Sequence, residues 1–118
     1  MAWEVEVTDE FAQWWDTLTV QEREALRSKL GRLAFYGRSL TSPHSKQFKG
    51  TRNELYELRS YNHGRPLRAV YAFDPRNTAI VLIGGDKTGD RDFYKRYLPI
   101  ADDLYDAHIA RLEREGLI

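Results

Sequence analysis

The chain has 118 residues, of which 42% are hydrophobic, so we expect one globular domain over residues 1–118 and exclude a second. It contains no cysteine, which excludes disulfides and thiolate chemistry; no run is apolar enough to cross a bilayer, and MAWEVEVTDE lacks a signal-peptide pattern, so we expect a cytoplasmic protein without membrane contact. The net charge of zero argues against a protein that coats RNA or DNA.

The first residues predict a strand and a short helix. WEVEV, residues 3–7, alternates apolar and acidic side chains, as a half-buried strand does. Thr8 can then cap a helix that continues to Leu18. The apolar stripe of this helix has core spacing, which favours packing over base stacking, and consists of Phe11, Trp14, Trp15 and Leu18.

A second helix is predicted from the sequence TVQE onward. Thr19 and Glu22 have the spacing of a capping box, and Gly37 is the expected end of the helix. Residues 39–53 are polar and are predicted to form a loop. The buried face of the helix would consist of Leu26, Leu30 and Leu33.

Three strands are expected next. LYELRSY, residues 55–61, and LRAVYAFD, residues 67–74, both alternate and are separated by NHGRP, which favours a hairpin. Asp74 before Pro75 favours a type I turn into TAIVLIGG, residues 78–85. This last run is apolar on both faces, as in a central strand.

The segment GGDKTG, residues 84–89, invites comparison with a phosphate-binding P-loop. It fails that comparison because Asp86 and Val81 stand where the P-loop needs glycines. We therefore expect the glycines to end the strand and turn the backbone sharply, with Lys87 facing an RNA phosphate. A plain strand-end turn is the alternative.

The C-terminal part predicts two helices. DRDFYKRY, residues 90–97, can form a short one, and Pro99 would open a longer one that stops at Gly116. The order β-α-α-β-β-β-α predicts the α+β class, with a small, mostly antiparallel sheet packed against two N-terminal helices and a C-terminal helix. The longer helix would carry Leu104, Tyr105, His108, Ile109 and Leu112.

Charge is segregated along the chain. Residues 1–24 hold seven acids and one base, residues 25–72 hold ten bases and two acids, and residues 101–118 are again acidic. We expect residues 27–68 and 87–96 to contribute to one basic concave face that binds a polyanion, with the two acidic segments outside it. An ordinary solvated surface is the alternative.

Two arginines of the predicted hairpin are candidates for a shared anion. Arg59 and Arg68 alternate out of the apolar pattern, and the hairpin can bring them together, although the register stays open. Glu57 could satisfy them in an ion pair worth at most about 1 kcal/mol, and a phosphodiester is the functional alternative. Arg68 should face solvent, so that its truncation changes stability by less than about 0.5 kcal/mol.

Other polar groups should converge on the arginines from neighbouring loops. The sequence has no metal-ligand pattern, catalytic carboxylate pair or nucleophilic serine motif, so we expect no metal and no cofactor. Cations and a tyrosine suit metal-independent phosphoryl transfer on RNA, because the ribose 2′-hydroxyl of the substrate is the nucleophile. The candidates are His44, Lys46, Lys49 and Arg52 before the hairpin, Lys87 and Arg91 after it, and Tyr94 one helical turn later.

The string ELYELRSYNHGRPLRAVYAFDPRNTAIVLIGGDKTGDRDFYKRYLPIADDLYDAH, with SPHSKQFKG upstream, resembles the HigB-type branch of the RelE/ParE toxin superfamily of type II toxin-antitoxin systems. The match spans nearly the whole chain, and its loose motifs are fairly specific in this order. The resemblance implies a RelE-like fold and a ribosome-dependent endoribonuclease that leaves a 2′,3′-cyclic phosphate and a 5′-hydroxyl. It also implies a cognate antitoxin, often of the helix-turn-helix type, and contact with operator DNA only through the antitoxin complex.

The resemblance also implies roles for single residues. Arg68 is similar to the arginine that stabilises the scissile phosphate, and Arg59 to the basic residue that ends the preceding strand. Lys87 or Arg91 matches the cation after the last strand, and Tyr94 resembles the tyrosine that orients or stacks on substrate.

The remaining candidates are assigned to RNA binding. Lys49 falls in the basic loop of the family, and His44 is either a base, as histidine is in some relatives, or a solvated loop residue. The RNA-binding set is Lys46, Lys49, Arg52, Arg91 and His44.

Two other functions remain open on the same fold, because fold does not fix function. One is a ParE-like toxin that poisons DNA gyrase without catalysis. The other is an inactive RelE-fold module that binds only its antitoxin and operator DNA. The combination of Arg59, Arg68, Lys87 and Tyr94 favours the nuclease, because a gyrase binder has no need of such a cluster.

Overall fold

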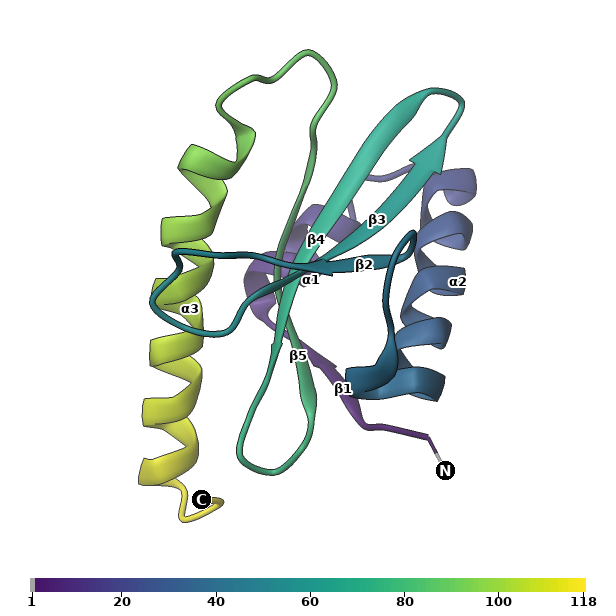
Figure 1. Ribbon diagram of the computed structural model, residues 1–118. Coiled ribbons are helices and arrows are strands. Elements are labelled where there is room, and N and C mark those ends of the chain that lie inside the picture. The colour runs from purple at the N-terminus through teal and green to yellow at the C-terminus, as the bar shows by residue number, and fades with distance from the viewer. Residues whose placement is uncertain (1) are drawn as a thin grey trace.

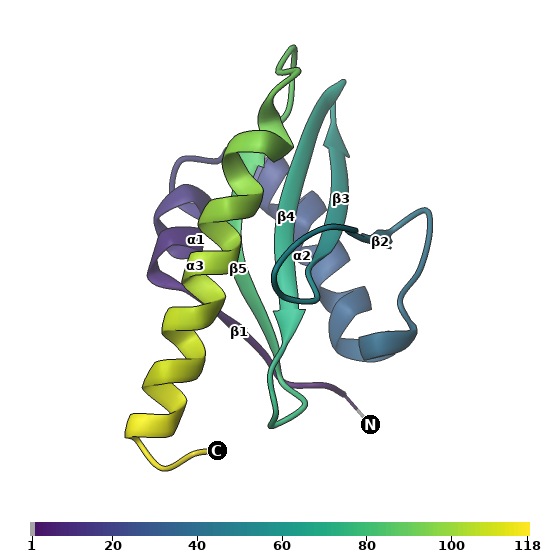
Figure 2. The same cartoon turned by 60° about the vertical axis from the view of Figure 1, so that its left-hand side comes forward.

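The computed structural model describes residues 2–118, which form a five-stranded sheet with helices on both faces (Figures 1 and 2). The strand order is β1-β5-β4-β3-β2; β1 runs parallel to β5, and the other pairs are antiparallel. Among the helices of residues 2–118, none is long and apolar enough to traverse a lipid bilayer. The elements are β1 (Val5–Val7), α1 (Asp9–Trp15), α2 (Val20–Tyr36), the 3-10 turn η1 (Gly37–Ser39), β2 (Ser45–Gln47), β3 (Tyr56–Asn62), β4 (Arg65–Phe73), β5 (Ala79–Asp86) and α3 (Phe93–Arg114).

The first helix begins at its predicted cap. The Thr8 side chain accepts a hydrogen bond from the third residue of α1 at 3.1 Å, and its hydroxyl donates to the Leu82 carbonyl at 2.5 Å. The helix ends at Trp15 and not at Leu18, because its last carbonyls are bonded by the Arg23 guanidinium and by a tight turn. The cap therefore also fixes α1 to β5.

The second helix shows the predicted capping box and stop. The Glu22 backbone N–H donates to the Thr19 side chain at 3.1 Å, and the Thr19 N–H donates to the Glu22 carboxylate at 3.0 Å. Gly37 caps the other end with a φ of 54°, and the indole of Trp3 occupies the space that a Cβ there would need. Only glycine meets both conditions without strain.

Both turns predicted around β4 are present. His63 and Gly64 join β3 to β4 with φ values of 49° and 80°, which is the backbone of a two-residue hairpin turn. In the next turn the Asn77 N–H donates to the Asp74 carbonyl at 2.8 Å, and Asn77 has a φ of 61°. These turns set the register that positions the arginines.

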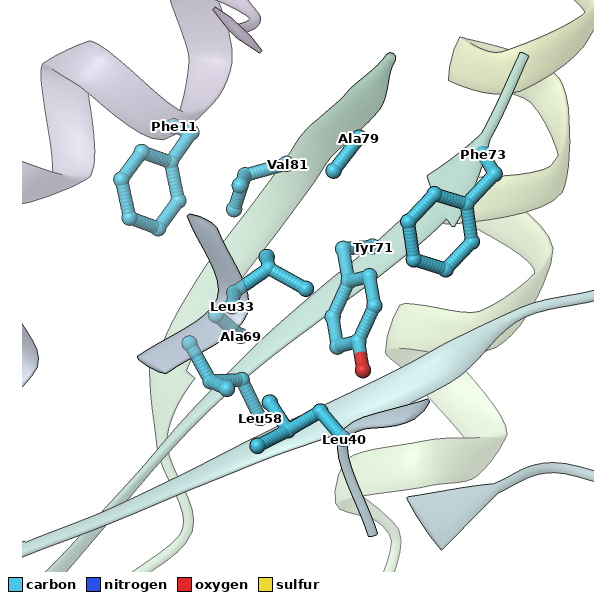
Figure 3. Close-up of a cluster of buried hydrophobic side chains, with 9 residues drawn as sticks. All are labelled: Phe11, Leu33, Leu40, Leu58, Ala69, Tyr71, Phe73, Ala79 and Val81. Carbon is cyan, nitrogen blue, oxygen red and sulfur yellow. The ribbon is translucent and has the colours of Figure 1, made fainter. Parts of the chain in front are cut away.

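The sheet separates two apolar layers. Alternation along β4 sends Tyr71 to the face covered by α1 and α2, and Val70 to the face covered by α3. The α3 layer combines Val70, Ala72, Ile80 and Leu82 with Ala101 of the helix. The other layer, drawn in Figure 3, consists of Phe11, Leu33, Leu40, Leu58, Ala69, Tyr71, Phe73, Ala79 and Val81.

The sequence did not predict strand β2. Residues 39–53 were expected to be a loop, but Ser45–Gln47 pair with β3 at the sheet edge. The Ser45 hydroxyl lies 2.5 Å from the Tyr71 hydroxyl, and both residues are buried. Three residues are too few for a pattern, so this strand depends on a tertiary contact that is invisible in the sequence.

The predicted helix boundary at Pro99 is wrong. Phe93–Arg114 form one continuous helix, with Pro99 as its seventh residue. Proline removes the hydrogen bond to the carbonyl four residues earlier, which is a substantial cost. The apolar face nevertheless packs on both sides of the proline, with Phe93 and Ala101 buried, and this burial keeps the helix whole.

Two of the predicted turn glycines lie inside a strand instead. Gly84 and Gly85 belong to β5, and neither has a positive φ. A Cβ on Gly84 would overlap the ring of Trp14, and a Cβ on Gly85 would lie 2.9 Å from the Tyr97 ring. The glycines therefore admit aromatic rings on both faces of the sheet. Gly89, with a φ of 63°, is the one in this segment that serves the turn.

We expect Gly84→Ala to lower the free energy of unfolding by about 1–3 kcal/mol, because the added methyl overpacks the Trp14 ring. Gly31→Ala is the control, since no atom lies within 4 Å of a Cβ there and a helical alanine should stabilise by about 0.5–1 kcal/mol. Urea unfolding of both variants measures the difference. A Gly84 variant as stable as the wild type would contradict the packing argument.

Candidate functional site

The two candidate arginines lie side by side on the α3 face of the sheet. Arg59 of β3 is directly opposite Arg68 of β4, and Arg68 is opposite Gly85 of β5. The missing side chain at Gly85 leaves room for the first turns of α3 over this row. The predicted convergence of the arginines is confirmed.

Glu57 lies between the arginines and is the anion that satisfies them in this structure. Its side chain is 2% exposed and accepts a hydrogen bond from Arg59 Nε at 2.5 Å, while Arg68 Nε lies 3.8 Å away. The Tyr94 hydroxyl donates to its other oxygen. This is the ion pair that the sequence allowed. Because it is buried, the limit of about 1 kcal/mol that holds for exposed ion pairs does not apply to it.

Arg68 is buried, which corrects the expectation that it faces solvent. It is 5% exposed; its guanidinium donates to the Tyr61 hydroxyl at 3.1 Å and to the Leu67 carbonyl at 3.1 Å. Its Nε has no hydrogen-bond partner within residues 2–118. The α3 layer covers this strand position, so truncation of Arg68 is not expected to be neutral for stability.

The surroundings of Arg68 keep it charged. Desolvation opposes the charge, but the hydrogen bond to Tyr61, followed by the Tyr94 hydroxyl and the charge of Glu57, outweighs it and raises the pKa of Arg68. The same hydrogen bond lowers the pKa of the Tyr61 hydroxyl. Tyr61 is 63% exposed, and its ring centroid lies 5.0 Å from the Arg68 guanidinium carbon. It therefore holds the arginine from the solvent side.

Tyr94 enters the site from the first turn of α3. Burial, followed by the hydrogen bond to Glu57, raises the pKa of the Tyr94 hydroxyl to about 12. The Lys87 ammonium lies 4.8 Å from the ring centroid, and the Phe48 ring meets it edge-on at 5.3 Å. Tyr94 is therefore a protonated hydrogen-bond donor at neutral pH.

We expect the raised pKa of Tyr94 to be measurable by ultraviolet titration of the phenols. Tyr94→Phe should remove one ionisation near pH 12 and leave that of Tyr71, whose pKa burial also raises to about 12. Glu57→Gln should shift the Tyr94 ionisation to lower pH, because the neighbouring negative charge is gone. An unchanged titration in the Gln variant would contradict the contact.

The raised pKa also has a consequence for stability. A phenol that ionises at about 12 when folded and near 10 when unfolded makes the folded state bind more protons between these values. Its contribution is therefore complete below pH 10 and is lost as the pH rises towards 12. Tyr94→Phe should flatten this part of the stability curve.

Of these side chains, Glu57, Arg59 and Tyr94 line an open groove of about 530 Å³, whereas Arg68 and Tyr61 are not part of its lining. Lys46 and Lys49 come from β2 and the loop after it, Arg59 from β3, and Lys87 from the turn after β5. Within residues 2–118, none of the three lysines has an acidic partner within 4 Å, so their charges remain available to a ligand. The lining is Lys46, Gln47, Phe48, Lys49, Glu57, Arg59, Lys87 and Tyr94.

Three of the predicted RNA-binding residues do not line this groove. His44 lies against α2, where its Nδ1 is 2.9 Å from Lys29 Nζ; desolvation and the nearby Lys29 lower the pKa of His44. Arg52 is engaged by α3, with 2.9 Å to Asp103. Arg91 is exposed in the turn before α3. The structure does not bring these three to the arginine pair.

The expected single basic face is wrong for α2. This helix packs on the sheet face opposite α3, so its bases are separated from the groove by the sheet (Figure 1). The apolar stripe of α2, and not its charge, determines which face of the sheet the helix covers. Helix α3 holds four basic and four acidic side chains and contributes Tyr94 to the rim. Without the bases of α2, the basic surface is narrower than the sequence suggested.

The sequence reasoning missed the central position of Glu57 and missed Tyr61 altogether. Both stand two residues from Arg59 in an alternating strand, and the period of two places all three on one face. The alternation can be read from the sequence, but the burial of Glu57 cannot. Residues 2–118 contain no group of three His, Asp or Glu side chains arranged to hold a metal ion.

A family model and two relatives of known sequence match this chain. The family described as phage-derived protein Gp49-like matches residues 13–106. HigB2 of Mycobacterium tuberculosis, provisionally named a toxin, is 28% identical over 96% of this chain, which spans 57% of the length of HigB2. HigB3 of the same organism, named in the same way, is 33% identical over 76% of this chain and 79% of its own length.

Solved structures of RelE share the fold. A double mutant of the Escherichia coli toxin RelE in the free state superposes with a TM-score of 0.59 at 17% identity, covering 95% of this chain and 99% of the other. RelE from the Pyrococcus horikoshii RelE–RelB complex gives 0.60 at 14% identity, covering 75% and 99%. The predicted α+β, RelE-like fold is thereby confirmed, with β2 added.

Proposed function

The chain belongs to the Gp49-like family and is a HigB-like member of the RelE/ParE superfamily, and from this membership we propose that it is a type II toxin that cleaves mRNA without a metal ion. The observation that carries the proposal is the row formed by Arg59 and Arg68 beside a groove rimmed by unpaired lysines. Such an arrangement suits a phosphodiester, which accepts bidentate hydrogen bonds from guanidinium groups.

The chemistry that we propose uses a nucleophile from the substrate. The ribose 2′-hydroxyl attacks the adjacent phosphorus, the bond to the 5′-oxygen breaks, and a 2′,3′-cyclic phosphate forms. Arg68 and Arg59 stabilise the negative charge on the non-bridging oxygens in the transition state, and Lys87 contributes a further charge. Arg68 is held in place by Tyr61 and Glu57, so little reorganisation is needed during the reaction.

Two groups in the site can handle protons. Glu57 is the one carboxylate that lines the groove in residues 2–118, and we propose that it accepts the proton of the 2′-hydroxyl once substrate has displaced a bonded partner. The Tyr94 hydroxyl, whose pKa of about 12 keeps it protonated, is suited to donate towards the leaving 5′-oxygen. His44 has no role here, because its ring lies against α2.

The partners follow from the same family membership. We propose a cognate antitoxin, of the helix-turn-helix type, that neutralises the chain, and contact with operator DNA only through that complex. A relative of known structure was solved as a RelE–RelB complex. We also propose that the mRNA is cut on the ribosome, since the groove is open and its cations can reach a strand presented there.

Brief expression in bacteria, followed by mapping of RNA 5′ ends, tests this proposal. We expect new 5′-hydroxyl ends within translated messages, and none with the antitoxin present. Assays of DNA gyrase in the same cells provide the other arm. Growth arrest with gyrase-dependent DNA breaks and no new RNA ends would replace the nuclease by a gyrase poison.

A further inference from the structure

Building on the proposed function, we infer that the groove continues into a further nucleotide subsite. This subsite binds a third nucleotide, next in the RNA to the two that the scissile phosphate joins. A further hollow of about 590 Å³ lies between the loop of residues 49–52 and the first turns of α3. It shares Lys49 and Tyr94 with the first groove, so the two hollows adjoin at these residues. The rest of its lining is Gly50, Thr51, Arg52, Lys95, Leu98, Pro99 and Asp102.

The chemistry of this hollow fits one nucleotide. Leu98 and Pro99 provide an apolar floor beside the Tyr94 ring, against which a base can lie. Lys49 and Lys95 stand at the rim, and neither has an acidic partner within 4 Å among residues 2–118. An apolar floor with free cations at its edge is complementary to a base and the phosphate attached to it.

Neighbouring cations provide a contrast within the same region. Arg52 is held by Asp103 at 2.9 Å and Asp106 at 2.6 Å, and Arg96 is paired with Asp90. These arginines have their counter-charges within the protein. Lys49 and Lys95 do not, so an external phosphate gains most at the two lysines.

The loop on one side of the subsite is fixed before any ligand binds. The Asp102 carboxylate, 5% exposed, accepts hydrogen bonds from the backbone N–H groups of Arg52 at 3.1 Å and Asn53 at 3.0 Å. The Asn53 side chain adds another to the same carboxylate at 3.0 Å. A preformed wall reduces the ordering cost of binding, which supports a functional groove.

Binding of short, uncleavable RNAs to the full chain tests the inference. The probe is a dinucleotide with a 2′-deoxy ribose at the cleavage position, compared with trinucleotides extended by one residue on the 5′ or the 3′ side. We expect one of the two extensions to tighten binding about tenfold, as one base contact and one phosphate contact allow. Isothermal titration at several salt concentrations measures the affinities.

Variants assign the gain to the subsite. Lys95→Ala should remove the gain from extension, lower the salt slope of trinucleotide binding by about one, and leave dinucleotide binding unchanged. Arg96→Ala, which removes a neighbouring paired cation, should keep the gain. If neither extension tightens binding, or if Lys95→Ala retains the gain, the subsite is refuted while the dinucleotide still binds. If neither the dinucleotide nor the trinucleotides bind, the subsite is refuted, while the proposed function is judged separately by the mapped RNA 5′ ends.

Discussion

Replacing Arg68 by alanine is expected to lower the rate of RNA cleavage by about two to three decades, because it removes a preorganised donor from the transition-state oxyanion. Arg68→Lys should restore only part of the rate, since an ammonium keeps the charge but not the bidentate fork. Toxicity should follow the same order. The measurement is single-turnover cleavage by purified variants, with growth at matched expression alongside.

Stability must be measured with these rates, because Arg68 is buried against Glu57 and Tyr61. We expect the alanine variant to lose on the order of 1–3 kcal/mol, as hydrogen-bonded groups lose a partner. Assays therefore run well below the melting temperature of each variant. Lys29→Ala removes a cation from the opposite face and should cleave normally. A folded Arg68→Ala variant that cleaves at the wild-type rate would refute the role of Arg68.

Glu57→Gln is expected to separate substrate binding from chemistry. The amide keeps the volume but cannot accept the proton of the 2′-hydroxyl, so cleavage should fall by about two to four decades. The loss of its charge leaves Arg59 and Arg68 without their buried counter-ion. Uncleavable RNA should therefore bind as tightly as before or more tightly, because its phosphate no longer competes with the Glu57 carboxylate for the two arginines.

The cost in stability should be large, since loss of one partner from a buried ion pair costs about 3–5 kcal/mol. Saturating RNA should raise the melting temperature of the Gln variant more than that of the wild type, because phosphate replaces the missing charge. Weaker RNA binding by the folded variant would show that Glu57 binds substrate directly. Unchanged cleavage would remove Glu57 from the proton transfer.

Local signals predicted much of the fold. Thr8, Thr19 with Glu22, and Gly37 each satisfy backbone groups within a few residues, so their roles can be seen in the sequence. The hairpin was predictable for the same reason, and its two-residue turn placed Arg59 opposite Arg68. Long-range packing was not predictable. Strand β2 depends on a contact between Ser45 and Tyr71, 26 positions apart in the sequence.

The same limit explains the errors at the site. Alternation correctly placed Arg68 on the face opposite to Leu67 and Ala69. It could not show that α3 covers this face, so the burial of Arg68 was missed. Gly85 was expected to form a turn because glycines favour turns, and the sequence does not show that the rings of Phe93 and Tyr97 fill the space beside it. His44 was grouped with Lys46 by sequence distance, yet its ring lies against α2. The extent of the domain over residues 1–118 and the roles of the site residues stay predictions.

The most direct test of the central claim is cleavage of an mRNA with a single 2′-deoxy substitution at the cut position, on ribosomes programmed with that message. The unmodified message should yield a 2′,3′-cyclic phosphate and a 5′-hydroxyl, and the substituted message should stay intact at that position while it still binds. Cleavage of the 2′-deoxy message at an undiminished rate would show that the nucleophile does not come from the substrate, and would contradict the mechanism built on Arg59, Arg68, Glu57 and Tyr94.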